Sequence, residues 1–103
     1  MKIEFIKCTR TNKAQKLRVK ELDISLAKIP GRIFQILYEN IGKPIQYVDI
    51  LNFVYEENET EADYFKLRVL DTNISTKIKP LAHKLGYDLK RQRGQSLTLI
   101  PLV

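Results

Sequence analysis

An apolar stripe at helical spacing in the C-terminal half restricts the fold of this chain more than any other feature. Six aliphatic residues recur three or four positions apart, and these are Leu67, Leu70, Ile74, Ile78, Leu81 and Leu85. At 100° per residue they fall within a narrow arc of one helix, and such a face is stable only when other elements bury it. Gly86 follows as a helix stop. The sequence therefore predicts a long amphipathic helix packed on a core.

The opposite face of this helix is small, polar and basic. Its centre and flanks hold Val69, Thr72, Thr76, Pro80, His83, Arg68, Asn73, Lys77, Lys79 and Lys84. Pro80 has no backbone N–H, so the bond from its nitrogen to the Thr76 oxygen is lost. We expect the helix either to end near Ile78 or to bend there, and the sequence leaves both alternatives open.

The first 27 residues have the alternating pattern of β-strands. Residues 16–20 and 22–26 each place aliphatic side chains on one face, but the two series are out of phase. A turn or bulge is therefore predicted near Glu21 and Leu22. A first strand over residues 2–9 is expected to pair with the second across the polar residues 10–15, which gives a short antiparallel sheet.

Two shorter helices are predicted between this sheet and the long helix. The first follows Pro30 and Gly31, continues its apolar stripe to Ile41 and stops at Gly42. The second has about ten residues, and its stripe is Val48, Leu51, Val54 and Tyr55. The predicted core consists of Ile33, Phe34, Leu37, Leu51, Val54, Leu70, Ile74, Ile78 and Leu85.

A hairpin around Gly94 is predicted to close the chain. We expect one α+β domain over residues 1–103, with strands in residues 1–27, a helical core in residues 28–86 and the hairpin in residues 87–100.

Charge is segregated along the chain. Residues 1–20 hold seven basic residues and one acidic residue, residues 21–63 hold three basic and nine acidic residues, and residues 64–103 hold eight basic and two acidic residues. A basic face and an acidic rear would fit a nucleic-acid binder, and an unevenly charged solvated surface is the alternative.

Residue types that carry chemistry are scarce. Cys8 is the only cysteine and His83 the only histidine, so an internal disulfide, a thiolate metal cluster and a paired-histidine site lack their residues. We expect no enzyme activity, cofactor, metal or small-molecule substrate. The longest nearly apolar run, residues 97–103, is far short of the roughly 20 residues of a membrane helix, and the N-terminus lacks a signal-peptide pattern. A cytoplasmic protein without a membrane partner is expected.

Three short motifs together resemble one family. The motif residues are Leu37, Asn40, Gly42, Ile45 and Ile50, then residues 69–75 (VLDTNIS), then Arg93, Gly94, Leu97 and Leu99. Over residues 17–100 their order and spacing resemble the DNA-binding output domains of OmpR/PhoB-type response regulators. Ser96 and Leu97 stand where the family's wing has Gly and Tyr. No receiver-type segment precedes the first strands, so control by phosphorylation in cis is not expected.

This resemblance implies a winged-helix fold and sequence-specific binding of double-stranded DNA by a transcriptional regulator. The third helix would enter the major groove and the hairpin, or wing, would meet the backbone or the minor groove. The predicted contacts from the helix are Arg68, Thr72, Asn73, Thr76, Lys77 and Lys79. Those from the wing are Lys90, Arg91, Arg93 and Gln95. Whether a homodimer binds the DNA is left open.

The acidic stretch Glu56, Glu57, Glu59, Glu61 and Asp63 allows two interpretations, the first of which concerns Glu56, Glu57 and Glu59. In the family, the loop between the second and third helices contacts RNA polymerase, and the resemblance implies the same contact here. The alternative is a solvated loop whose acids cap the third helix, with Thr60 and Asp63 as a capping box. A second function also stays open, that of a winged-helix protein-interaction module such as a mobile-element protein that binds host RNA polymerase.

Overall fold

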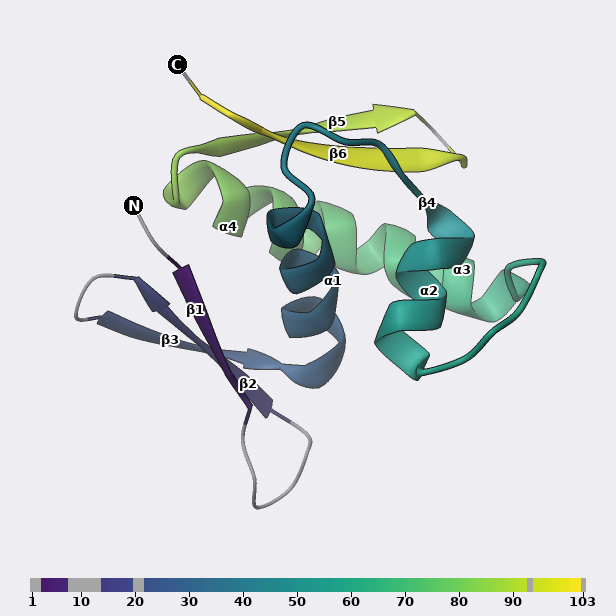
Figure 1. Cartoon of the computed structure of the whole chain (residues 1–103), viewed down its shortest axis with the longest axis horizontal. Coiled ribbons are helices and arrows are strands. Elements are labelled where there is room, and N and C mark those ends of the chain that lie inside the picture. The colour runs from purple at the N-terminus through teal and green to yellow at the C-terminus, as the bar shows by residue number, and fades with distance from the viewer. Residues whose placement is uncertain (1–2, 8–13, 20–21, 93, 103) are drawn as a thin grey trace.

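The protein has an α+β fold in the computed structural model, which describes residues 3–7, 14–19, 22–92 and 94–102 (Figure 1). The elements are β1 (Ile3–Lys7), β2 (Ala14–Val19), β3 (Leu22–Ala27), α1 (Lys28–Glu39), β4 (Ile45–Gln46), α2 (Tyr47–Tyr55), α3 (Tyr64–Asn73), η1 (Ile74–Ile78), α4 (Lys79–Lys84), β5 (Tyr87–Gln92) and β6 (Ser96–Pro101). Helix α1 lies between the N-terminal sheet and the β5–β6 hairpin. None of the described helices is both long and apolar enough to cross a membrane.

The N-terminal sheet is antiparallel, with strand order β1-β2-β3. Strand β1 pairs Phe5 with Leu17 of β2, and β2 pairs Leu17 in turn with Ile24 of β3. Of the two predicted alternatives, a turn or a bulge, the antiparallel pairing of Val19 with Leu22 fits the turn. Residues 2, 8 and 9 of the predicted first strand, and Glu21 of the predicted turn, lie outside the described residues.

Helix α1 is shifted toward the N-terminus relative to the prediction. It begins at Lys28, so Pro30 and Gly31 lie within its first turn, where a proline leaves no additional N–H unpaired. It ends at Glu39, and Ile41 is 37% exposed in the turn that follows, so the prediction that Ile41 extends the buried stripe is wrong. Gly42 adopts a φ of +83°, and its N–H donates to the Leu99 oxygen at 2.8 Å. This bond ties the end of α1 to β6.

The third helical segment continues through Pro80. Elements α3, η1 and α4 follow one another without a break, and η1 is a π-helical turn in which the Lys79 N–H donates to the Ile74 oxygen, five residues back. The wider turn changes the bonding pattern just before the residue that cannot donate to Thr76. The alternative in which the helix ends near Ile78 is therefore wrong.

The start of α3 also differs from the prediction. Asp63 is the N-cap, and its carboxylate accepts bonds from the Phe65 N–H at 2.8 Å and the Lys66 N–H at 3.3 Å. The predicted capping box placed Asp63 three residues inside the helix, with Thr60 as the cap. The helix starts three residues later because an Asp side chain itself satisfies the free N–H groups of the first turn.

The elements α3, η1 and α4 together are called the long helix below. The core forms where α1, α2, the long helix and the β5–β6 hairpin meet. All nine residues predicted for it are buried, which confirms the predicted core. Six further buried members are Tyr47, Ile50, Leu81, Ala82, Leu97 and Leu99. The last two come from β6, the centre of a second antiparallel sheet of order β4-β6-β5. Strand β4 was not predicted because two residues are too few to show a period.

Candidate nucleic-acid interface

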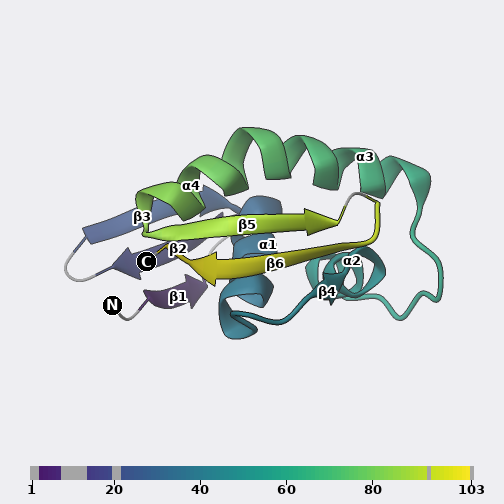
Figure 2. The same cartoon turned by 90° about the horizontal axis from the view of Figure 1, so that it is seen from above.

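The long helix presents a surface that the rest of the described chain leaves open. Figure 2 shows α3 and α4 running along one edge of the molecule, with β5 beside α4. The predicted residues of this helix are exposed, with Asn73 half-buried; they are Arg68, Thr72, Asn73, Thr76, Lys77 and Lys79. They share one surface because the buried stripe of the same helix turns toward α1 and α2.

Two polar side chains on this surface bond to the helix that carries them. The Asn73 Nδ2 donates to the Val69 oxygen at 2.9 Å, and the Thr76 Oγ1 donates to the Thr72 oxygen at 2.7 Å. These bonds hold both side chains close to the helix backbone. The side chains therefore project little from the helix, and another molecule's backbone or base edges can approach it closely. The bond to the Val69 oxygen uses one of the two Nδ2 hydrogens of Asn73, and a bidentate contact with adenine would use the second hydrogen together with the Oδ1.

Arg91 has a structural role that the sequence did not reveal. Its Nε donates to the Tyr47 hydroxyl at 3.0 Å, and its Nη2 forms an ion pair with Asp71 of α3. Arg91 therefore joins the β5–β6 hairpin to both α2 and α3, and its guanidinium is engaged within the protein. No local pattern predicts this contact, because Arg91 lies 20 residues from Asp71 and 44 from Tyr47.

The other predicted wing residues are partly placed. Lys90 and Gln95 are exposed. The backbone of Gln95 holds the end of the hairpin, since its oxygen accepts the Tyr47 N–H at 2.9 Å and its N–H donates to the Gln92 oxygen at 2.9 Å. Arg93 lies outside the described residues. Among the described residues of this group, Lys90 is an exposed cation. Gln95 has an exposed side-chain amide and lies close to the first turn of α2.

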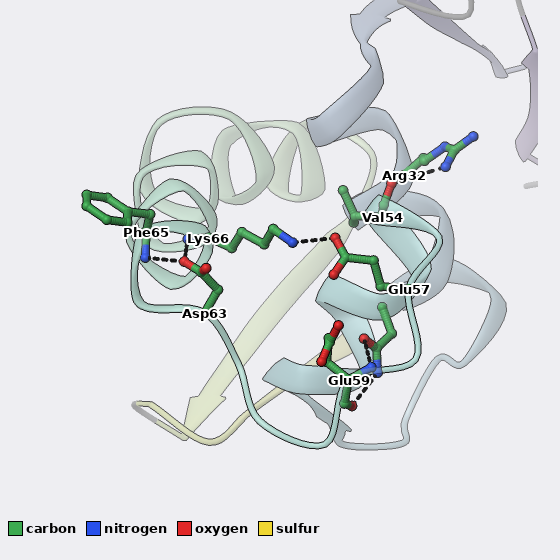
Figure 3. Close-up of polar contacts among 8 residues, drawn as sticks. Arg32, Val54, Glu57, Glu59, Asp63, Phe65 and Lys66 are labelled. Atoms are coloured by element: carbon green, nitrogen blue, oxygen red, sulfur yellow. Dashed lines mark hydrogen bonds and ion pairs between the residues drawn. The ribbon is translucent and has the colours of Figure 1, made fainter.

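The acidic loop between α2 and α3 is held by its own contacts. Glu56 has a left-handed backbone, φ 57°, and pairs at 3.2 Å with Arg32, a nearly buried residue that also donates to the Val54 oxygen at 3.1 Å and so caps α2. Glu57 forms an ion pair with Lys66. The Asn52 amide bonds both the N–H and the oxygen of Glu59, each at 3.0 Å (Figure 3).

These contacts place the acids away from the exposed surface of the long helix. In Figure 3 the Lys66 side chain extends toward Glu57, whereas Phe65 points in the opposite direction. An open cavity of about 420 Å³ lies under the loop, and its lining includes Leu51, Asn52, Glu57 and Lys66. The hydrogen bond from Lys66 to Glu57 is the main cause that raises the pKa of Lys66. Asp63 is the acid that caps α3, so the capping interpretation is confirmed for Asp63 and not for the three glutamates.

Two exposed aromatic residues at the start of α3, Tyr64 and Phe65, were missed by the sequence reasoning, and they adjoin the exposed Val69. Phe65 is 74% exposed, Tyr64 68% and Val69 40%. The Tyr64 and Phe65 rings meet edge to face at 6.1 Å, and the Arg68 guanidinium lies 5.9 Å from the centre of the Tyr64 ring. A signal was present, because Phe65 stands one helical turn before Val69, which the pattern had already placed on the polar face.

A pH-dependent contact fixes the junction of α4 and β5. The His83 Nε2 lies 2.9 Å from the Asp88 Oδ1. The bond from His83, followed by the Leu89 N–H, lowers the pKa of Asp88 below its ordinary 3.8. A carboxyl with a lowered pKa stabilises the fold above its unfolded pKa and loses that contribution as pH falls through the folded value.

We therefore expect the Asp88→Asn variant to lose part of the acid sensitivity of the wild type. The melting temperature of wild type should fall more steeply than that of the variant as pH drops below about 4. Thermal unfolding followed by circular dichroism between pH 2 and 6 measures both slopes. His83→Ala is the matched variant, since it removes the partner and keeps the carboxyl. Equal slopes for Asp88→Asn and wild type would contradict this assignment.

No family model, curated protein or solved structure matches this chain. The described residues form an exposed polar and basic helix surface, an acidic loop on another side of that helix, and a hairpin fastened to the helix by Arg91.

Proposed function

We propose that this protein is a sequence-specific, double-stranded DNA-binding transcriptional regulator with a winged-helix architecture. The long helix would enter the major groove, and the β5–β6 hairpin would act as the wing on the backbone or in the minor groove. The observation that carries the proposal is the exposed surface of α3, η1 and α4, where short polar side chains stand between cations and no carboxylate is free.

The order of the elements supports this architecture. Helix α2 is followed by a connection and then by the exposed helix, as in a helix-turn-helix unit, and a hairpin follows directly. Strand β4 joins the segment before α2 to β6, and Arg91 fastens β5 to α3. The hairpin is thus held in a defined position relative to the helix, which a wing needs in order to touch DNA at the same time as the helix.

The side chains of the surface divide into two chemical classes. Thr72, Asn73 and Thr76 are short and can meet base edges, and Asn suits adenine. Arg68, Lys77, Lys79 and Lys90 are long cations suited to phosphates, which supply most of the affinity irrespective of sequence. Asp71, the one acid among the described residues of the long helix, is paired with Arg91 and so is neutralised.

A second candidate is a winged-helix protein-interaction module, for example one that binds RNA polymerase. The exposed Tyr64 and Phe65 favour it, because aromatic residues are enriched at protein interfaces. They stand next to the loop of Glu56, Glu57 and Glu59, to which the family resemblance gives a polymerase contact. A stable complex with polymerase and no shift of duplex DNA would favour this function.

The proposed function is tested by selecting a preferred site from random duplex DNA and titrating both DNAs by fluorescence anisotropy. Asn73→Ala should cost about 1–3 kcal/mol on the preferred site, roughly 5- to 150-fold, and little on random duplex. Lys90→Gln should weaken both DNAs similarly and reduce the log–log salt slope by about 0.9. Absence of duplex binding by wild type at low salt would contradict the proposal.

A further inference from the structure

Two apolar side chains occupy the first half of the exposed surface of the long helix. Phe65 is 74% exposed and Val69 is 40% exposed. They stand four residues apart, so they share one face of α3, and Thr72 and Thr76 continue the same face toward η1. Apolar side chains rimmed by polar and basic residues are typical of surfaces that a partner covers in a complex.

A hollow beside Val69 leaves room for a small group. Arg68, Val69, Thr72 and Asn73 line an open hollow of about 220 Å³. Phe65 points away from Asp63 and from the pair of Lys66 and Glu57, so neither of these two carboxylates stands between it and an approaching molecule (Figure 3). The hollow therefore borders an aliphatic side chain, a cation and two short polar groups.

We infer that Phe65 and Val69 read thymine, each by contacting the C5-methyl group that this base presents in the major groove. Thymine is the only base with a methyl group on that edge, and apolar side chains, Phe and the Thr methyl among them, recognise it there. The residues near the N-terminus of a recognition helix are those that meet base edges. The inference rests on the proposed function, since it needs α3 in the major groove.

The charges next to the pair favour DNA over a protein as the occupant. Arg68 borders the hollow, and Lys77 and Lys79 follow on the exposed surface of the same helix. An apolar contact edged by cations suits a polyanion that exposes methyl groups between two rows of phosphates. The preferred site should accordingly contain two thymines under the first half of α3.

The inference is tested by replacing each thymine of the selected duplex, one at a time, with deoxyuridine. This change removes the methyl group and keeps every hydrogen-bonding group of the base. At two positions the wild type should lose about fourfold in affinity, as expected for one buried methyl group. Val69→Ala should bind the thymine duplex several-fold more weakly and lose its sensitivity to deoxyuridine at one of these positions. Phe65→Ala should do the same at the other.

The control is Ile41→Ala, since Ile41 is an aliphatic residue of similar exposure, 37%, outside the helix. Its deoxyuridine profile should equal that of wild type, and circular dichroism verifies that all three variants are folded. Specific binding without sensitivity to deoxyuridine at any position would overturn the inference and leave the proposed function standing. The full deoxyuridine penalty in both Val69→Ala and Phe65→Ala would overturn it as well. Failure of wild type to bind duplex DNA at low salt would overturn both.

Discussion

Replacing Ile74 with Asp should abolish the cooperative unfolding transition of the protein. Ile74 is 3% exposed and lies in η1, where it packs into the core shared by α1 and the long helix. The variant loses the burial of an aliphatic side chain, roughly 2–5 kcal/mol, and also places a carboxylate in the core without a partner. The sum approaches the whole free energy of unfolding of a small domain, about 5–15 kcal/mol.

Circular dichroism and differential scanning calorimetry measure this outcome. Ser75→Asp is the matched control, because it introduces the same residue one position along, where the side chain is exposed. It should melt cooperatively, close to wild type. A cooperative transition of normal enthalpy in Ile74→Asp would show that this face of the helix is not in the core.

The helical stripes could be predicted from sequence because their information is local. Leu70, Ile74 and Ile78 repeat at the period of a helix, and burial of that face follows from the pattern alone. The same reasoning failed at Ile41, because the apolar residue continued the pattern past the point where the helix ends. Periodicity of apolar residues therefore predicts which face of a helix is buried better than it predicts where the helix ends.

The effect of Pro80 on the helix could not be predicted from the sequence alone. The missing N–H predicts a disturbance of the helix, but the sequence gives no reason to choose between a break, a bend and a wider turn. The structure places a π-helical turn just before the proline, so that Ile74, Ile78 and Leu81 all remain buried while the helix continues. Packing of the stripe on both sides of Pro80 determines this outcome.

The predicted site and the structure differ most where a side chain makes a contact with a residue far away in the sequence. Lys77, Lys79 and Lys90 are exposed, as their positions on the helix and hairpin predict. Arg91 looked equivalent in sequence, yet it pairs with Asp71 and bonds Tyr47. A cation's availability depends on partners that the fold brings near, and no local pattern contains them.

Reversing three cations of the long helix should nearly eliminate DNA binding. In the variant Arg68→Glu, Lys77→Glu and Lys79→Glu, three exposed cations become carboxylates that repel phosphates. If each cation makes one charge-assisted contact of roughly 1.5 kcal/mol, the loss is on the order of a thousandfold, before repulsion is added. The log–log salt slope should also fall by about 2.7. All three side chains are exposed, so folding should persist.

Two controls distinguish a local surface from the effect of net charge. Replacing Lys77 and Lys79 with Arg keeps the charge and should leave the affinity within a few-fold of wild type, because phosphates accept either cation. Replacing Glu56, Glu57 and Glu59 with Gln makes the protein more basic by three charges. The carboxylates of Glu56 and Glu57 are paired with Arg32 and Lys66, and the backbone of Glu59 is bonded to Asn52, so all three acids belong to the loop. Specific DNA affinity at fixed salt should therefore stay nearly unchanged. Anisotropy titrations at several salt concentrations measure all three variants. A large change in affinity from the loop variant, together with a small change from the helix variant, would place the DNA against the loop.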